Sequence, residues 1–135
     1  MKLKNLSLLL VVAVLFASVL ACGSTAPAGV SNVYMANDEE GNNKTTTFAP
    51  TDVIYVFFDV NGIDEGAQFQ VKWYALTVDG QDPNEAFTTT DYTYTDEATI
   101  YANIESTDGG FPAAQYKVEI YLNGAKVGEQ QFSVQ

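Results

Sequence analysis

The sequence predicts an all-β fold, a seven-stranded antiparallel β-sandwich that follows an N-terminal signal helix. Beyond residue 30 the apolar residues come in short runs separated by Gly, Asn, Asp and Pro, and no stretch keeps the period of a helix. Eight tyrosines and eight phenylalanines stand among many threonines. Aromatic and β-branched side chains suit the pleated surface of a sheet, so composition and pattern predict the same fold class.

Residues 1–21 are typical of a secretion signal. Lys2 and Lys4 give a positive start, and the apolar run that follows is short for a membrane span and ends in small residues. The run closes with the letters VLAC, which resemble the lipobox of bacterial lipoproteins. The resemblance implies transfer of a lipid to the Cys22 thiol and cleavage after Ala21. The alternative is an ordinary secretion signal with an incidental cysteine.

Residues 22–30 are predicted to be a flexible tether, because small and polar residues with one proline cannot form a core. About eight extended residues reach at most ~28 Å, so the domain at residues 31–135 would be held close to the lipid bilayer. The acyl chains on Cys22 would provide that membrane contact. The expected location is extracytoplasmic and membrane-anchored, on the outer membrane if the host has two membranes.

Seven strands are predicted from alternating or apolar runs bounded by turn residues. In the second strand an outward Asp59 turns the even-numbered residues from 54 to 60 toward the core. The third strand turns Trp73 inward and Tyr74 outward, and the sixth turns Tyr116 inward and Glu119 outward. The predicted strands are 32–36, 52–60, 67–77, 87–95, 98–105, 115–122 and 126–134.

Short strands with turns at this spacing are typical of a two-sheet sandwich. Trp73 on the third strand and Tyr116 at the start of the sixth resemble the immunoglobulin-like layout, in which a core tryptophan and a corner tyrosine hold these places. The usual cysteine pair is missing, so the resemblance is to disulfide-free, fibronectin-III-like domains. Asn123-Gly124 predicts a type I′ hairpin, and the C-terminal stretch also looks like the closing hairpin of uncharacterised Ig-like lipoproteins. The resemblance implies a fold and a location, and supplies no activity.

Charge and composition exclude several function classes. The formal net charge is −11, removal of the two signal lysines makes it −13, and there is no arginine. Such a surface is a poor partner for nucleic acid, which requires clustered basic residues. Histidine is absent and Cys22 is the only cysteine, which excludes Ser–His and Cys–His nucleophiles and His/Cys zinc sites. A carboxylate pair of the glycosidase type is the remaining alternative, but nothing in the sequence places two acidic residues across an apolar cleft. We therefore expect no catalytic residues, no metal site and no enzyme activity.

The acidic loops leave weak Ca²⁺ binding as an open alternative to an expectation of no cofactor. In an Ig-like topology the loops after the first, third and fifth strands emerge at one end, where their oxygens could converge. A second acidic stretch lies at the opposite end, without the EF-hand pattern. The simpler interpretation is solvated turns that keep the domain soluble. The residues are Asp38, Glu39, Glu40, Asp79, Asp82, Glu85 and Asp108 at one end, and Asp59, Asn61, Asp64 and Glu65 at the other.

Outward aromatic residues are the predicted binding patch. Tyr55 and Phe57 face outward on the second strand and Tyr101 on the fifth, and these strands neighbour each other in an Ig-like sheet. Tyr74 and Tyr121 would pair in the same way across the third and sixth strands. An exposed apolar patch often marks a binding site. Aromatic cross-strand pairs also stabilise sheets without any ligand.

The function expected from these observations is that of a membrane-anchored, non-enzymatic module that contacts an unidentified protein or serves as an envelope structure. The alternative is a glycan- or small-ligand-binding domain that uses the outward aromatic residues.

Overall fold

The computed structural model describes residues 29–135, which form eight strands and no helix. The predicted signal helix, its cleavage point after Ala21 and the lipidation site at Cys22 lie outside the described residues. Within the described part of the chain, no helix is long and apolar enough to cross a membrane. The strands are β1 (Gly29–Ala36), β2 (Thr47–Phe48), β3 (Ile54–Asn61), β4 (Gln68–Ala75), β5 (Thr88–Thr93), β6 (Thr99–Ile104), β7 (Ala114–Leu122) and β8 (Ala125–Val134).

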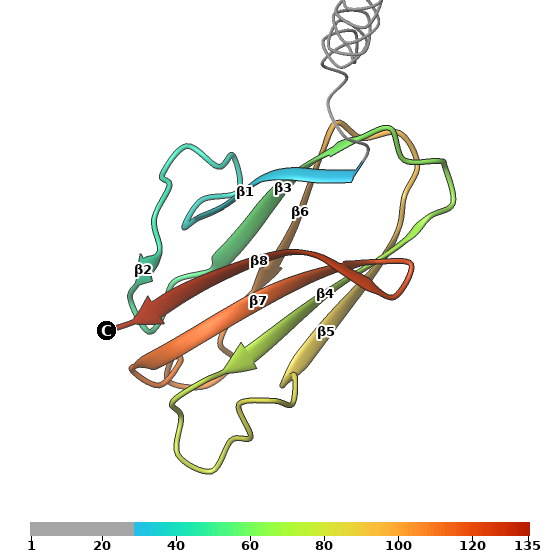
Figure 1. The fold of residues 1–135 in the computed structure, drawn as a ribbon. Coiled ribbons are helices and arrows are strands. Elements are labelled where there is room, and N and C mark those ends of the chain that lie inside the picture. The colour runs from blue at the N-terminus through green and yellow to red at the C-terminus, as the bar shows by residue number, and fades with distance from the viewer. Residues whose placement is uncertain (1–28) are drawn as a thin grey trace, which may run out of the picture.

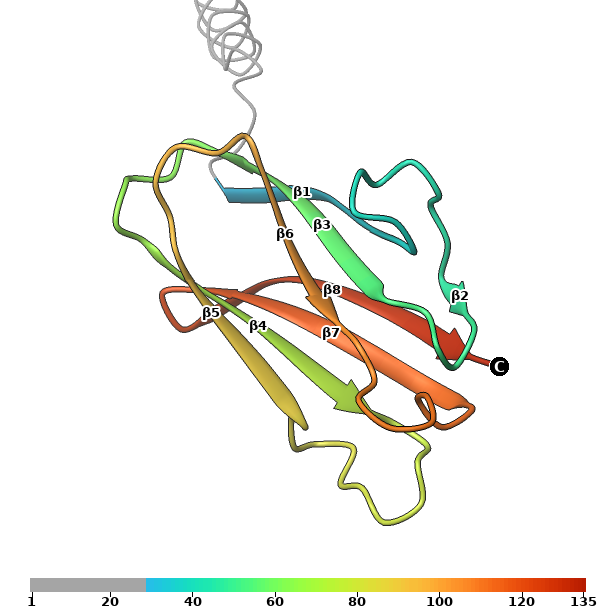
Figure 2. The ribbon, with the colours of Figure 1, turned by 180° about the vertical axis from the view of Figure 1, so that it is seen from behind.

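Two sheets face each other (Figures 1 and 2). The small sheet has three strands in the order β1-β3-β6, and the large sheet has five in the order β2-β8-β7-β4-β5. The chain changes sheet at every connection except β4–β5 and β7–β8. Most strands that are neighbours in the sequence therefore lie in different layers, as in an Ig-like sandwich.

Strand β2 corrects the predicted seven-strand antiparallel arrangement. It contributes an eighth strand of 2 residues and lies parallel to β8, with Thr47 opposite Ser133 and Phe48 opposite Val134. The sequence predicts no strand at these residues, because two residues are too few to show a period of two. Only the pairing with β8, far along the chain, makes it a strand.

Strand β1 begins at Gly29, three residues before the predicted start and inside the range predicted as a tether. Its pairing with β3 shifts register between Ser31 and Tyr34, and Asn32 has a positive φ of 49°. Such a bulge interrupts the inside–outside alternation. The alternation in the sequence therefore predicted only residues 32–36 and missed the first residues of β1.

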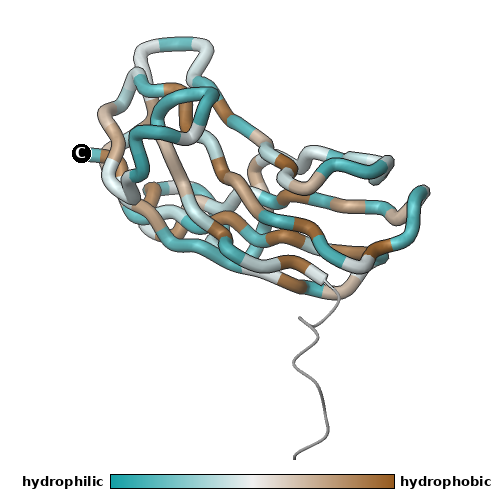
Figure 3. The backbone as a smooth tube through the Cα atoms, turned by 90° about the horizontal axis from the view of Figure 1, so that it is seen from above, coloured by the Kyte–Doolittle hydropathy of each residue, from teal (hydrophilic) through white to brown (hydrophobic). Residues whose placement is uncertain are grey.

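The core lies between the two sheets, and its alternation follows the predicted phase. Ile54, Val56 and Phe58 on β3 are fully buried, as are Phe69 and Trp73 on β4. Figure 3 shows hydrophobic and hydrophilic segments alternating along the strands. Burial of one face of each strand provides the main driving force for this fold.

Trp73 and Tyr116 occupy the places that the Ig-like resemblance predicted. Trp73 packs edge-on against Phe132, with ring centroids 5.9 Å apart. Tyr116 is 2 % exposed, and its hydroxyl donates a 2.7 Å hydrogen bond to the carbonyl oxygen of Pro112, four residues upstream. This is the tyrosine corner of Ig-like domains. The core tryptophan and the corner tyrosine of the Ig-like layout are thus both present in a domain without the disulfide.

The β7–β8 hairpin turns at Asn123-Gly124, as predicted. Both residues have positive φ, 48° and 86°, which a type I′ turn requires. Asn123 also accepts a hydrogen bond from the backbone N–H of Gln68, 2.9 Å away, and so fastens the hairpin to the start of β4. The hairpin lies at the end of the sandwich where β1 begins (Figure 1). The β4–β5 and β6–β7 loops and the C-terminus lie at the opposite end.

Candidate functional site

The outer face of the small sheet carries the three predicted patch residues, and the structure brings them together. Phe57 on β3 lies directly opposite Tyr101 on β6, with ring centroids 5.6 Å apart. Tyr55 lies 6.0 Å from Tyr101 and 6.2 Å from Phe57 by the same measure. Two neighbouring strands with aromatic residues at matching alternate positions produce this arrangement. We call these rings, together with Tyr34 on β1, the aromatic face.

Tyr34 is the member that the sequence analysis missed. It lies opposite Phe57, and the two rings stack at 5.0 Å with an interplanar angle of 6°. The Lys44 ammonium lies 3.9 Å from the Tyr34 ring centroid on a segment that returns beside β1. The bulge in β1 hid the phase of Tyr34, and no local pattern could place Lys44 over it.

Phe57 is buried rather than exposed, which corrects the expectation of a flat patch of three open rings. Only 4 % of Phe57 is exposed, Tyr55 is half-buried, and Tyr101 is 46 % exposed. Stacking by Tyr34 covers one side of Phe57, and the loop at residues 37–43 covers more. The open part of the aromatic face is therefore Tyr101 with the edge of Tyr55.

Gly41 brings the loop onto the rings. It has a φ of 69°, and a Cβ atom there would lie 2.9 Å from the Tyr34 hydroxyl and 3.2 Å from Cζ of Phe57. Asp38 holds the loop closed by accepting backbone hydrogen bonds from Asn42 at 3.0 Å and Asn43 at 2.7 Å. Only glycine combines this conformation with so close an approach.

Glu39, on the same loop, fixes the exposed tyrosine. The Tyr101 hydroxyl donates a 3.0 Å hydrogen bond to Oε1 of Glu39. This hydrogen bond and the charge of Glu39 raise the pKa of Tyr101. Burial, followed by the charges of Glu39 and Glu105, raises the pKa of Tyr55. Both tyrosines therefore stay neutral near pH 7, within a negatively charged surrounding.

The acidic side chains considered for Ca²⁺ do not form a ligand cluster. Within residues 29–135, no group of three or more His, Cys, Asp or Glu residues lies close enough to hold a metal ion. Several of these carboxylates instead accept hydrogen bonds within their own turns or strands. Asp59 accepts from Asn32 and Thr99, and Asp82 accepts from the backbone of Asn84.

The second predicted aromatic pair, Tyr74 and Tyr121, meets around a carboxylate on the outer face of the large sheet. Glu119 was expected to be outward, yet it is only 5 % exposed. Its carboxylate pairs with Lys117 at 2.9 Å and Lys126 at 3.5 Å, and accepts a 2.7 Å hydrogen bond from the Tyr121 hydroxyl. We call these residues the Glu119 network.

The Glu119 network is buried because tyrosine rings and lysine side chains cover it. The Lys117 ammonium lies 4.8 Å from the Tyr74 ring centroid, and Lys72 lies 4.4 Å from that of Tyr121. Burial raises the pKa of Glu119, but hydrogen bonds from Lys117, Tyr121 and Tyr74 outweigh it and lower the pKa to about 2. Tyr74, also predicted to face outward, is 8 % exposed. The network leaves no open tyrosine ring comparable to Tyr101.

No protein-family model matches the sequence, and no curated protein is significantly similar to it. Among solved structures, the chain is similar to an immunoglobulin-like protein from Pseudomonas aeruginosa, with a TM-score of 0.55 and 15 % identity over 84 % of this chain and 100 % of that one. It is also similar to part of the alkylpurine DNA glycosylase AlkC from Pseudomonas fluorescens, solved with DNA containing an abasic-site analogue. That likeness has a TM-score of 0.52 and 10 % identity over 80 % of this chain and 30 % of that one.

At these identities the likeness shows the fold alone. Residues 29–135 are an Ig-like β-sandwich, as the tryptophan and the corner tyrosine indicated.

Proposed function

We propose that this chain is an extracytoplasmic lipoprotein whose Ig-like domain, anchored through an acylated Cys22, binds a protein partner through the aromatic face. The observation that carries the proposal is the Tyr101 ring, which is 46 % exposed beside Tyr55 and is oriented by Glu39. The same domain could serve an envelope structure by the same contact. In a host with two membranes, the outer membrane is the proposed location.

The chemistry of the aromatic face supports a protein partner. Tyrosine presents a large amphipathic surface and loses little side-chain entropy on binding, so it is enriched at interfaces. Tyr101 is already held by Glu39, which lowers that entropic cost further. Glu40 and Glu105 add negative charge nearby, which would steer a partner of opposite charge.

The absence of histidine and of a second cysteine in the sequence supports a non-enzymatic role. The proposed acylation consumes the one thiol, and no other pair of nucleophile and base is evident. Binding without catalysis is therefore the function that we propose.

The anchor is tested by replacing Cys22 with Ala. The variant should lose incorporation of labelled palmitate and leave the membrane fraction, because two or three acyl chains are needed for stable anchoring. Ser24→Ala, the matched change two residues further on, should behave as the wild type. A Cys22→Ala protein that still sediments with membranes would contradict the lipid anchor.

The partner contact is tested by comparing the wild type with Tyr101→Ala in a quantitative pull-down from the producing cell. A specific partner should fall by about tenfold or more for Tyr101→Ala, in line with a central aromatic contact. Tyr121→Ala, checked for folding by circular dichroism, changes the opposite face and should retain the partner. Equal recovery by wild type and Tyr101→Ala would overturn the proposed surface.

A glycan is the second candidate for the aromatic face. An exposed ring beside a carboxylate can stack on a sugar and accept hydrogen bonds from its hydroxyls, as Tyr101 and Glu39 are arranged to do. Titration with soluble cell-wall saccharides separates the two candidates. Saturable binding that is lost in Tyr101→Ala would favour the glycan.

A further inference from the structure

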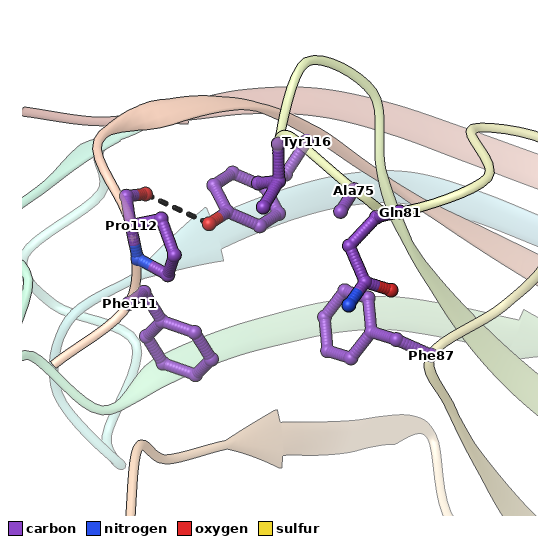
Figure 4. Close-up of a pocket in the computed structure, with 7 residues that line it drawn as sticks. Ala75, Gln81, Phe87, Phe111, Pro112 and Tyr116 are labelled. Carbon is purple, nitrogen blue, oxygen red and sulfur yellow. Dashed lines mark hydrogen bonds between the residues drawn. The ribbon is translucent and has the colours of Figure 1, made fainter. Parts of the chain in front are cut away.

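A second open surface lies at the end of the sandwich that carries the β4–β5 and β6–β7 loops, opposite the start of β1. Phe87, Phe111 and Tyr116 line a slot of about 170 Å³, with Ala75 and Pro112 completing its walls. The Phe87 and Phe111 rings each meet Tyr116 edge-on, at centroid distances of 6.3 and 6.4 Å. Figure 4 shows the two phenylalanine rings facing one space beside the tyrosine. We call this space the aromatic slot.

The walls of the aromatic slot are fixed by hydrogen bonds. The backbone N–H of Phe87 donates to the carbonyl oxygen of Trp73 at 2.9 Å, and that of Phe111 donates to the carbonyl oxygen of Pro50 at 2.7 Å. A Cβ atom on Gly110 would lie 2.8 Å from Cβ of Pro50, so the β6–β7 loop packs tightly there. A slot that is already formed needs little ordering when it is filled.

The lining of the aromatic slot is apolar. The hydroxyl of Tyr116 already donates to Pro112, so it offers no free donor to a ligand. Gln81 is the other polar side chain among the residues that line the slot in the described chain. Phe87 is 38 % exposed, and it and Tyr101 are the two exposed large apolar side chains in residues 29–135. An exposed ring at the rim of a formed slot is typical of a docking position.

The volume of the aromatic slot matches one small ring. A closed apolar cavity of about 150 Å³ binds benzene in another protein, so a slot of this size can accept a phenylalanine or leucine side chain. A hollow of about 470 Å³ with a mixed polar and apolar lining adjoins it and shares Phe87, Phe111 and Pro112. The hollow is lined further by Asn103, Glu105 and Thr107, which can contact a peptide backbone. Slot and hollow together fit a side chain that projects from an extended segment.

The negative charge around the aromatic slot favours basic residues on either side of the bound side chain. The loops at residues 76–87 and 105–113 contain no lysine or arginine, and each contains acidic residues. Glu105 lines the adjoining hollow directly. An occupant with lysine or arginine beside its apolar side chain is favoured here over a neutral or acidic one. The acidic residues of the two loops are Asp79, Asp82, Glu85, Glu105 and Asp108.

We propose that the aromatic slot binds an aromatic or branched aliphatic side chain of a positively charged segment of a partner protein. The slot shares no residue with the aromatic face, so either proposal can fail while the other stands, although Glu105 lies near both. It lies at the end of the domain opposite Gly29, and is therefore accessible if the chain is anchored at its N-terminus.

The test uses the full chain in phosphatidylcholine vesicles and three blocked peptides, KKFKK, KKGKK and EEFEE. Free peptide after sedimentation is measured by mass spectrometry, and empty vesicles give the background. KKFKK should bind at least about tenfold more tightly than either other peptide, and raising NaCl from about 0.05 to 0.5 M should weaken it by about tenfold. Equal binding of KKFKK and KKGKK would overturn the proposal.

Two variants locate the binding. Phe87→Ala should weaken KKFKK about fivefold or more while circular dichroism shows a folded domain. Asp82→Asn with Glu105→Gln leaves the slot intact and should reduce the salt dependence. Glu65→Gln with Asp96→Asn makes the same change in charge at the opposite end and should have no comparable effect.

Two outcomes would contradict the proposed binding at the aromatic slot. Unchanged affinity of folded Phe87→Ala places the peptide elsewhere and rejects the slot. If KKFKK does not bind but the chain self-associates through Phe87, measured by sedimentation velocity, the occupant is a second copy and the proposed partner chemistry is wrong.

Discussion

The outer faces of the two sheets carry similar residues and differ in how far their own charges cover them. On the large sheet Lys72 and Lys117 lie over tyrosine rings, and Glu119 joins Lys117, Lys126 and Tyr121 into one network. On the small sheet one lysine covers Tyr34, and Tyr101 remains 46 % exposed.

The lysines distinguish the covered aromatic residues of this molecule from the open one. Three of the four lysines in the described residues lie on the large sheet. Their aliphatic stems and charges satisfy the tyrosines and the carboxylate there, so that face stabilises the fold. The small sheet has too few cations to do the same, and its open ring is available to a partner.

The largest expected effect comes from breaking the Glu119 network. Glu119→Gln removes the charge that pairs with two lysines, and we expect a loss of about 3 kcal/mol in the free energy of unfolding, because the cations lose their buried partner. Urea denaturation followed by tryptophan fluorescence measures it. Glu129→Gln changes the exposed end of the Lys126 pairing and should cost at most about 0.5 kcal/mol. Equal losses would show that the burial of Glu119 has no special role.

Acid should open the same network in the wild type. The pKa of Glu119 is lowered from 4.5 to about 2 in the folded protein, so its ionised form contributes stability above the unfolded value. That stability is lost as pH falls from about 4.5 toward 2, and amounts to about 2 kcal/mol between pH 5 and pH 3.

Unfolding curves of wild type and Glu119→Gln at these pH values isolate the contribution, because the other carboxyl groups titrate in both proteins. The gap between the two proteins should close as pH falls. A gap that stays constant would place the pKa of Glu119 near its ordinary value.

The next largest effect on stability is expected in the loop that covers the aromatic face. Gly41→Ala should lose about 1 kcal/mol more stability than Gly80→Ala, because both glycines have positive φ but only Gly41 contacts Tyr34 and Phe57. Thermal and urea unfolding of the two variants measure the difference. Equal losses would mean that the loop does not press on the rings.

Tyr101→Ala should have the smallest effect on stability. The ring is half exposed and contributes two cross-strand aromatic contacts, so we expect a loss of about 0.5 kcal/mol together with loss of the proposed partner. Tyr101→Phe keeps the ring and removes only the hydrogen bond to Glu39. A loss of several kcal/mol in Tyr101→Ala would mark the residue as structural.

Prediction from sequence succeeded for the strands whose alternation is regular. The inward phase of β3, β4 and β7, the Asn123-Gly124 turn and the Tyr116 corner are all present in the structure. It failed at the two-residue β2 and at the bulged β1, where alternation is absent or broken. These two strands are defined by pairing with β8 and β3, which lie further along the chain.

Three of the four rings of the aromatic face were predicted from the sequence, but their exposure was not. Tyr55, Phe57 and Tyr101 were expected on one face, and they contact one another there. Phe57 is nevertheless buried, because Tyr34 and the Gly41 loop cover it. The aromatic slot had no signal in the sequence, since Phe87, Phe111 and Tyr116 come from separate segments.

The all-β class, the inward residues of the regular strands and the lipobox-like motif follow from the amino-acid sequence alone, because each depends on local periodicity or spacing. Which outward residues are covered depends on the tertiary structure. Period two sends a side chain to one face of a sheet, but its exposure depends on what distant loops and strands place above it. Glu119 and Phe57 were therefore assigned to the correct face and became buried, while Tyr101 stayed open.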